Sequence, residues 1–408
     1  MREDRPSTAP IETRTGLPDR SRSRVVHVTT VHRSQDPRIF RKQVQSLSEA
    51  GFDTHLIAPH PKEEVVDGIP IHALPRRRGR LRRLTLQPSA FRRSVALHAE
   101  LYHFHDPELI PCMYLVKQAT GACVVYDMHE DYASRGGAMG TLLRLLETWC
   151  FRWVDHVVTA EVGYDPILEG QPISRTLIAN YHRPFNGDVA TAKENEQSEG
   201  TEDTGARQPR RLLYTGTIAN DRGLDVMLDV AEAIRERGRA ERLCIAGVCN
   251  RSGELRAAER RRRQKDLTDI VERVGWDRFV PPENLAQYYH DADVGLVLFD
   301  RHPNFVQSFP TKFYEYLHHG LPFICTDVPL WRSFVEENDC GAVVPPNDPE
   351  AVLQVLDRWN RNPERFRELQ QNARQAAQKY RWSQMAERLV GVYDDLLSES
   401  RRSAQPGR

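Results

Sequence analysis

The sequence lacks a disulfide or zinc pattern, a long apolar run and a net charge. Its seven cysteines are odd in number and include no C-x-x-C pair, so we expect reduced thiols in a cytoplasmic protein. No stretch approaches the roughly 20 apolar residues that cross a bilayer, and the polar N-terminus lacks the apolar core of a signal peptide. Lys plus Arg and Asp plus Glu both number 57, so bulk charge does not indicate nucleic acid as a partner.

Where the sequence is patterned, strand-like and helix-like segments alternate. With 408 residues the chain exceeds the length at which one hydrophobic core keeps growing, so two domains are expected. β-Branched runs such as 25–31 are separated by helical stretches such as 107–118, and the alternation restarts at 212–215. This order predicts an α/β protein of two doubly wound, Rossmann-like domains, each with helices on both faces of a parallel sheet.

Polar segments mark the expected boundaries. Residues 186–210 are rich in Glu, Asp, Thr, Ser and Gly, which is typical of an exposed insertion or linker. After Asp348 the pattern is helical almost to the end, and Pro349 suits the first turn of a helix. The predicted order is a disordered tail at 1–23, a first domain at 24–185, the linker at 186–210, a second domain at 211–382, a helix at 383–398 that could pack back on the first domain, and a tail at 399–408.

A glycine-bearing loop follows the predicted strand at 212–215. Ligands of doubly wound sheets bind outside the carboxyl ends of the strands, so this loop is a candidate site. Gly216 would let the backbone approach a phosphate, and Arg222, next to Gly223 at the start of a helix, would add a cation. The alternative is an ordinary turn whose arginine faces solvent, and this loop alone does not decide between the two.

A lysine stands in the first turn of a predicted helix that begins near Ser308 or Pro310. Lys312 adds positive charge to the positive end of that helix, which is unfavourable unless an anion lies there. The favoured hypothesis is that Lys312 faces a diphosphate and Glu315 accepts hydrogen bonds from hydroxyl groups. The alternative is a surface ion pair between Lys312 and Glu315, which is worth a few tenths of a kcal/mol.

Polar residues also follow two predicted strands of the first domain. His129 follows one strand, and His105, Asp106 and Glu108 follow another, so all four are expected in a ligand-facing crevice. The alternative for His129 is a capping or solvated loop residue.

The D-x-D spelling of a metal site occurs once, at Asp291 and Asp293. These two residues join the end of a predicted helix to an apolar strand, so no metal site is predicted.

Taken together, several segments resemble family 4 retaining glycosyltransferases with the GT-B fold. The pattern Pro310-x-Lys312-x-x-Glu315-Tyr316-x-x-x-Gly320-x-Pro322 is similar to the donor-binding segment of that family. The similar segments are, in chain order, 102–108, 126–132, 293–296, 310–322 and 340–350. The resemblance covers about residues 24 to 398 outside the linker. It implies an acceptor-side first domain and a second domain that binds a nucleotide sugar, with a cleft between them.

The resemblance also implies roles for single residues. It places Arg222 at the family's donor-phosphate lysine, Glu315 at the glutamate that binds the ribose, and His129 near the transferred sugar. The remaining implied donor residues are Gly216, Thr217, Gly223 and Lys312, and the acceptor-side candidates are His105, Asp106 and Glu108. The implied outcome is retention, with a UDP- or GDP-sugar as donor and with no metal ion or other cofactor.

Two positions depart from the family's pattern. Thr217 stands where a basic residue often follows the loop glycine, which removes one phosphate contact. Gln307, a candidate catalytic residue, stands where the first glutamate of the E-x7-E motif would lie. Its amide could bond a sugar hydroxyl but would not stabilise positive charge as a carboxylate does. Both departures bear on the reaction rate and the choice of donor more than on the fold.

Arginines are concentrated between Arg76 and Arg93, with leucines and a phenylalanine among them. As a surface of the first domain this segment could bind anionic lipid headgroups or an acceptor phosphate. The alternative is an arginine-rich helix face that is simply solvated. No recognised nucleic-acid-binding module accompanies the arginines, so nucleic acid is not the predicted partner.

These observations predict a metal-independent transferase that moves a sugar to a glycan or lipid-linked acceptor in cell-surface polysaccharide or glycolipid synthesis. We expect the protein in the cytoplasm. A further expectation is that it contacts the inner face of the plasma membrane peripherally. Two alternatives remain open: another GT-B enzyme such as a nucleotide-sugar epimerase, or a catalytically silent binding protein, the latter because of Thr217 and Gln307.

Overall fold

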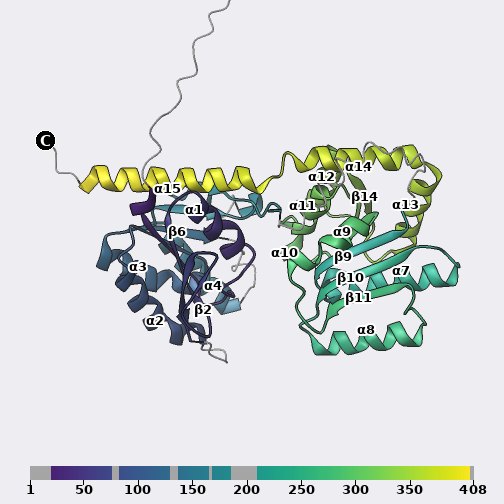
Figure 1. Cartoon of the computed structure of the whole chain (residues 1–408), viewed down its shortest axis with the longest axis horizontal. Coiled ribbons are helices and arrows are strands. Elements are labelled where there is room, and N and C mark those ends of the chain that lie inside the picture. The colour runs from purple at the N-terminus through teal and green to yellow at the C-terminus, as the bar shows by residue number, and fades with distance from the viewer. Residues whose placement is uncertain (1–19, 76–81, 129–136, 165–167, 185–208, 405–408) are drawn as a thin grey trace, which may run out of the picture. The chain divides into compact units, whose positions relative to one another are not determined.

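The computed structural model describes residues 20–75, 82–128, 137–164, 168–184 and 209–404 (Figure 1). The chain divides into two compact units, Met1–Tyr126 together with Val390–Arg408, and Asp127–Leu389. Within the described stretches, no helix is both long and apolar enough to cross a bilayer.

Eight strands form the first sheet, in the order β3-β4-β2-β1-β5-β6-β7-β8. β1 pairs in parallel with β2 and β5, and the short strand β3 runs antiparallel to β4. Apart from β3, the chain fills the sheet outward from β1 and then outward from β5, which is the doubly wound arrangement. The strands are β1 (Arg24–Val28), β2 (Asp53–Pro59), β3 (Glu64–Val66), β4 (Ile69–Leu74), β5 (Leu101–Phe104), β6 (Cys123–Met128), β7 (His156–Thr159) and β8 (Arg175–Leu177).

The first helical segment shows how sequence and packing agree. The carboxylate of Asp36 accepts the backbone N–H groups of Arg38 and Ile39 at 2.9 and 3.0 Å, which caps the segment. Phe40 and Val44 then bury their side chains with residues of β2 and β4. The helical elements up to residue 164 are η1 (Arg20–Arg22), η2 (Ile39–Val44, a π-helix), α1 (Gln45–Glu49), α2 (Arg82–Leu97), η3 (Pro107–Leu109), α3 (Ile110–Thr120), α4 (Gly137–Cys150) and η5 (Val162–Tyr164).

Six strands form the second sheet, in the order β11-β10-β9-β12-β13-β14, and all five pairings are parallel. From β9 the chain adds β10 and β11 on one side of the sheet, and from β12 it adds β13 and β14 on the other side. The switch point, where doubly wound sheets bind ligands, therefore lies between the neighbouring strands β9 and β12. The strands are β9 (Arg211–Thr217), β10 (Arg242–Val248), β11 (Val271–Trp276), β12 (Val294–Val297), β13 (Phe323–Thr326) and β14 (Gly341–Val344).

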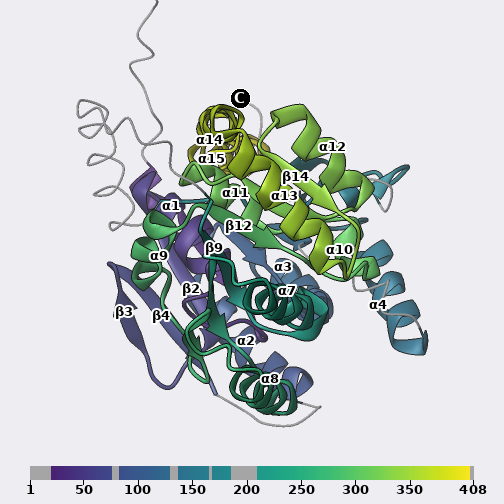
Figure 2. The same ribbon diagram turned by 90° about the vertical axis from the view of Figure 1, so that its right-hand side faces the viewer.

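Helices α12 and α13 pack beside β14, and α14 contacts both of these helices (Figure 2). α13 is capped by the Asp348 carboxylate, which accepts the N–H of Ala351 at 2.9 Å, and it starts with Pro349 as expected. The helical elements of this half are η6 (Asn220–Arg222), α7 (Leu224–Glu236), α8 (Ser252–Gln264), η7 (Pro282–Asn284), α9 (Ala286–Asp291), α10 (Pro303–Val306), α11 (Thr311–His318), α12 (Pro329–Asn338), α13 (Pro349–Arg361), α14 (Pro363–Ala377) and α15 (Trp382–Ala404).

The predicted fold class, two doubly wound α/β sheets followed by C-terminal helices, is confirmed. Three strands carry too weak a pattern to be predicted: β3, β8 and β11. All three lie at sheet edges, where one side of the strand faces no neighbour and the apolar run of a central strand is not needed.

Both predicted tails need correction. α15 continues to Ala404, six residues beyond the predicted end at 398, and Arg401 forms an ion pair with Glu100 at 2.9 Å. Near the N-terminus, Arg20 lies in η1 and pairs with Asp394 of α15 at 2.6 Å. Arg20 and the last turns of α15 are therefore held by contacts between segments distant in sequence, which composition alone does not reveal.

Candidate functional site

A row of glycines crosses the carboxyl ends of three neighbouring strands of the second sheet. Gly216 of β9 pairs in register with Gly247 of β10, and Gly247 pairs with Gly275 of β11. All three have positive φ angles, and a Cβ atom at Gly247 would overlap the carbonyl of Gly216. The backbones can approach one another only because side chains are missing there. The row leaves an edge of bare backbone beside the switch point.

The side chain of Lys312 reaches this edge. A Cβ atom at Gly216 would lie 2.7 Å from Cε and 3.0 Å from Nζ of Lys312. Lys312 belongs to the first turn of α11, so the structure brings together two of the predicted donor residues from positions almost a hundred apart in the sequence. Their meeting places an ammonium group where a phosphate would approach the glycine.

Glu315, one turn along α11, lies within the same group of side chains. Its two carboxylate oxygens are 3.4 and 3.3 Å from Nζ of Lys312, so the ion pair considered as the alternative does form. The pair is not a simple surface contact, because the side chains are only 12% and 21% exposed. An ammonium group has three N–H donors, so Lys312 can bind Glu315 and an anionic ligand together.

Two further side chains hold the Glu315 carboxylate. The hydroxyl of Tyr289, from α9, donates to Oε2 of Glu315 at 2.5 Å, and Oγ1 of Thr215 lies 2.8 Å from that hydroxyl. Burial raises the pKa of Tyr289 well above its ordinary value, so the phenol keeps the proton that it donates. This arrangement orients Glu315 before any ligand binds.

Arg222 is held by aromatic rings. It ends η6 directly after β9, and its guanidinium carbon lies 5.5 and 5.4 Å from the ring centroids of Phe299 and Phe305. Cation–π contacts of this kind fix an arginine without neutralising it, so its charge remains available to an anion. Gly223 follows in the left-handed region, and a Cβ atom there would overlap the carbonyl of Leu298.

Thr217 and Gln307, the two departures from the family pattern, are both exposed. Thr217 ends β9, and Gln307 lies in the turn between α10 and α11. Their exposure leaves each side chain accessible to a ligand, and their roles stay predictions.

A pocket of about 380 Å³ opens at the end of β11, next to the row of glycines. Its lining residues include Gly275, Asn284, Gln287 and Tyr288. Amides can read the hydrogen-bonding edge of a heterocycle, and the aromatic ring supplies an apolar wall.

The predicted acceptor-side residues lie at the switch point of the first sheet, between β1 and β5. His105 is completely buried, with Nε2 2.9 Å from Nδ1 of His27. Asp106 is also buried, and its Oδ2 accepts the hydroxyl of Thr29 at 3.0 Å and the N–H of Thr30 at 2.5 Å. This carboxylate therefore shapes the loop after β1, and direct contact with an acceptor stays a prediction.

Glu108, in η3, is half-buried, and its backbone carbonyl accepts the side-chain amide of Gln87 at 2.8 Å. His129 lies outside the described residues, so its predicted role near the transferred sugar stays a prediction.

Of the two residues of the D-x-D pair, Asp291 and Asp293, the second has a structural role. Oδ2 of the buried Asp293 accepts the backbone N–H groups of Arg210 and Arg211 at 3.0 and 2.8 Å, where β9 begins. Asp291 is exposed and lies near Arg211. These bonds agree with the interpretation that the pair joins a helix to a strand.

The sequence analysis missed Gly247, Thr215 and Tyr289. Gly247 could have been found, because it follows an apolar strand in the same way as Gly216 does. Tyr289 carries no comparable pattern, since it is one of two adjacent tyrosines in a short helix.

Two family models match the chain. The Glycosyl transferase 4-like domain matches residues 37–162, and Glycosyl transferases group 1 matches residues 197–379. The chain is a family 4 glycosyltransferase of the GT-B fold. The second match contains every predicted donor residue, from Gly216 to Glu315. The family predicted from the sequence segments is thereby confirmed.

Curated relatives of this glycosyltransferase are 25–30% identical to it within the matched stretches. The D-inositol 3-phosphate glycosyltransferase of Thermomonospora curvata is 29% identical over 72% of this chain and 71% of its own length. The D-inositol 3-phosphate glycosyltransferase 1 of Catenulispora acidiphila is 27% identical, but the match spans only 45% of that protein. The amylovoran biosynthesis glycosyltransferase AmsK of Erwinia amylovora is 25% identical over 37% of this chain and 36% of its own.

Solved structures share the fold of this glycosyltransferase at lower identity. A sucrose-phosphate synthase from Thermosynechococcus elongatus superposes with a TM-score of 0.71 at 18% identity, covering 93% of this chain and all of its own. Anabaena HepE, in complex with UDP, reaches 0.65 at 10% identity and covers 91% of this chain and all of its own. These likenesses show the GT-B fold.

Proposed function

We propose that this glycosyltransferase transfers a sugar, with retention, from a UDP- or GDP-sugar to a glycan or lipid-linked acceptor in cell-surface polysaccharide or glycolipid synthesis. The observation that carries the proposal is the position of Lys312 over the bare backbone of Gly216, at the switch point of the second sheet. The UDP in the related HepE structure and the names of the inositol-phosphate and amylovoran relatives support it.

The chemistry follows from where charge develops. When the bond between the sugar carbon and the diphosphate oxygen breaks, negative charge grows on the diphosphate and the sugar acquires positive character. The ammonium of Lys312, the guanidinium of Arg222 and the N-terminal N–H groups of α7 and α11 would stabilise the leaving diphosphate. Glu315, held by Tyr289, would accept the ribose hydroxyls, and the amide-lined pocket at the end of β11 would hold the base. The acceptor hydroxyl then bonds to the sugar carbon, and its proton passes to the diphosphate oxygen that has left that carbon.

A thermal-shift screen of nucleoside diphosphates and nucleotide sugars tests the proposal, because a ligand that binds only the folded chain raises its melting temperature. We expect one base to stabilise the protein, and we expect Arg222→Ala and Glu315→Ala each to remove that shift or abolish turnover. Hydrolysis of the matching donor without acceptor would then separate an active transferase from a silent binding protein. Isomerisation of the sugar without release of nucleotide would instead indicate an epimerase. Wild-type binding and turnover in both variants would refute the site.

We also propose peripheral contact with anionic membrane through Arg76–Arg93. The described part of this segment includes Arg93 of α2, which forms an ion pair with Glu63 at 2.6 Å, and Arg92, which is exposed on the same helix. Co-sedimentation with vesicles should increase with anionic lipid and decrease with salt. Vesicle binding that changes neither with the fraction of anionic lipid nor with the salt concentration would refute this part of the proposal.

A further inference from the structure

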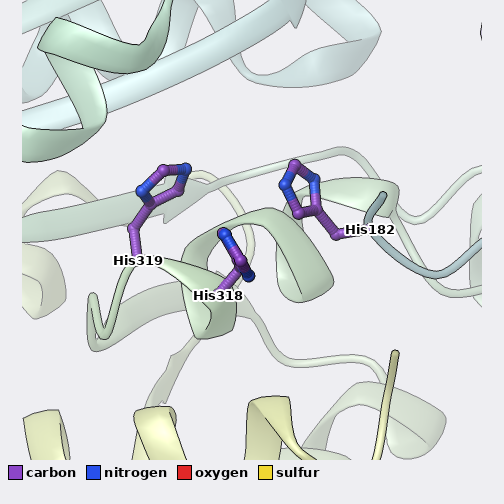
Figure 3. A group of neighbouring side chains, drawn as sticks. All are labelled: His182, His318 and His319. Carbon is purple, nitrogen blue, oxygen red and sulfur yellow. The ribbon is translucent and has the colours of Figure 1, made fainter. Parts of the chain in front are cut away.

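Three histidines from two distant segments meet beside the donor residues. His318 ends α11, His319 follows it, and His182 comes from the segment after β8 (Figure 3). One ring nitrogen of each lies within 4.8 Å of one from each of the others. The ring centroids of His182 and His318 are 4.5 Å apart, and those of His318 and His319 are 5.0 Å apart.

We infer that His182, His318 and His319 form a binding site for one divalent transition-metal ion, with Zn²⁺ as the best-fitting cation. Three imidazoles with an open fourth position are an established ligand set for zinc, whereas Mg²⁺ and Ca²⁺ prefer oxygen ligands. Tetrahedral bonds of about 2.05 Å would place the three nitrogens about 3.4 Å apart, so the rings need to close by little more than an ångström. His318 and His319 are half-buried and His182 is buried, so a metal would be only partly exposed to water.

The surroundings of the three rings favour a cation. They lie at the carboxyl end of α11, where the negative end of the helix dipole attracts positive charge. The ring of His319 stacks on Tyr289 with the centroids 4.4 Å apart and the planes at 8°, which limits the freedom of one ligand. Groups behind the ligands that orient them in this way commonly strengthen metal binding.

The ion would link segments that are far apart in the sequence. The carbonyl of His182 accepts the N–H of Trp382, the first residue of α15, so a metal would tie the end of α11 to the region where α15 begins. Tyr289 connects the same site to the donor residues, since its hydroxyl donates to Glu315. The role that this placement supports is to stabilise the donor-side helix, separate from the transfer chemistry, for which no metal is predicted.

Zn²⁺ titration of the full chain, expressed without a histidine tag and stripped with chelator, tests the site. We expect one Zn²⁺ per chain by elemental analysis after dialysis, a higher melting temperature, and a visible absorption spectrum typical of tetrahedral coordination when Co²⁺ replaces Zn²⁺. His318→Gln and His182→Gln should each raise the dissociation constant for Zn²⁺ by about tenfold or more. The matched control is His290→Gln, on the exposed side of α9, which should bind as wild type does.

Failure of the wild-type chain to retain Zn²⁺ would overturn the inference, as would retention that both His318→Gln and His182→Gln leave unchanged. If one variant unfolds, circular dichroism will reveal it. The other variant and the Co²⁺ spectrum of the wild type then show whether the three histidines bind the metal. Because these readouts use the chain without any nucleotide, they stay informative even if the proposed transfer reaction is wrong.

Discussion

The ammonium of Lys312 lies against the backbone of Gly216, close enough that a methyl group on the glycine would come within 3.0 Å of Nζ. The lysine comes from α11 and the glycine from the end of β9, so the contact exists only when the two elements pack. It defines the point at which we expect the diphosphate to bind.

Gly216→Ala should weaken nucleotide binding more than it weakens the fold. The added methyl group displaces a flexible lysine, which costs little, but it moves the ammonium and forces alanine to a φ of +118°. We expect a loss of about 1–3 kcal/mol in the free energy of unfolding and a clear rise in the dissociation constant for the nucleoside diphosphate. Urea unfolding and calorimetry measure the two effects. The control is Gly253→Ala, where an added Cβ atom would have no atom from elsewhere in the fold within 4 Å. This variant should leave nucleotide binding unchanged.

Lys312→Met tests the charge at the same point. A hydrogen bond to a charged group contributes about 1.5–3 kcal/mol, so the dissociation constant for the nucleoside diphosphate should rise about 10- to 150-fold. The free energy of unfolding should also fall by about 1–3 kcal/mol, since the largely buried carboxylate of Glu315 loses its cation. Lys265→Met, directly after α8, removes an ion pair with Glu232 of α7 away from the candidate site and is the control. Equal affinities in all three proteins would show that Lys312 does not contact the donor.

Tyr393→Phe should destabilise the first unit. The Tyr393 hydroxyl lies 2.8 Å from Nδ1 of His103 and 3.1 Å from Nε2 of His27, and all three side chains are fully buried. Loss of the hydroxyl leaves buried ring nitrogens without that partner, at a cost of about 1–3 kcal/mol per group. Chemical denaturation followed by circular dichroism measures the loss. Tyr288→Phe, at a partly exposed position on α9, serves as the control. A Tyr393→Phe protein as stable as wild type would mean that this network contributes nothing.

Asp36 should make stability depend on pH in the acid range. Burial alone would raise the pKa of Asp36, but its contact with His32 and its hydrogen bonds from Ile39 and Arg38 lower it to about 2. Because the pKa is lower in the folded chain than the ordinary value of 3.8, this stabilisation is complete above about pH 4 and is lost as the pH falls towards 2. The difference corresponds to about 2 kcal/mol.

Urea unfolding at pH 5 and at pH 3 compares wild type with Asp36→Asn. The wild-type chain should lose more stability than the variant between these two values, since asparagine does not titrate. An equal loss in both proteins would show that the carboxylate of Asp36 has the same pKa in the folded and unfolded chain.

Central strands were predictable because they are apolar on both faces. β5, β6, β7 and β13 have the bounds that their residue patterns suggest, since strands covered by helices on both sides require continuous apolar runs. The candidate donor residues could be proposed for a related reason: loops at the carboxyl ends of such strands are few, and Gly216, Lys312 and Glu315 all lie in or beside them. The edge strand β11 and the length of α15 were missed because their neighbours, not their composition, stabilise them.

The sequence by itself determined the alternation of strands and helices, the family and the residue types at the candidate donor site, since these follow from periodicity and local spacing. Only the tertiary structure decided which of those residues meet. The register that aligns Gly216 with Gly247 and Gly275, the hydroxyl of Tyr289 on Glu315, and the approach of His182 to His318 and His319 all join segments distant in the chain. Contacts of this kind depend on how helices pack on a twisted sheet, and local sequence patterns carry no record of that packing.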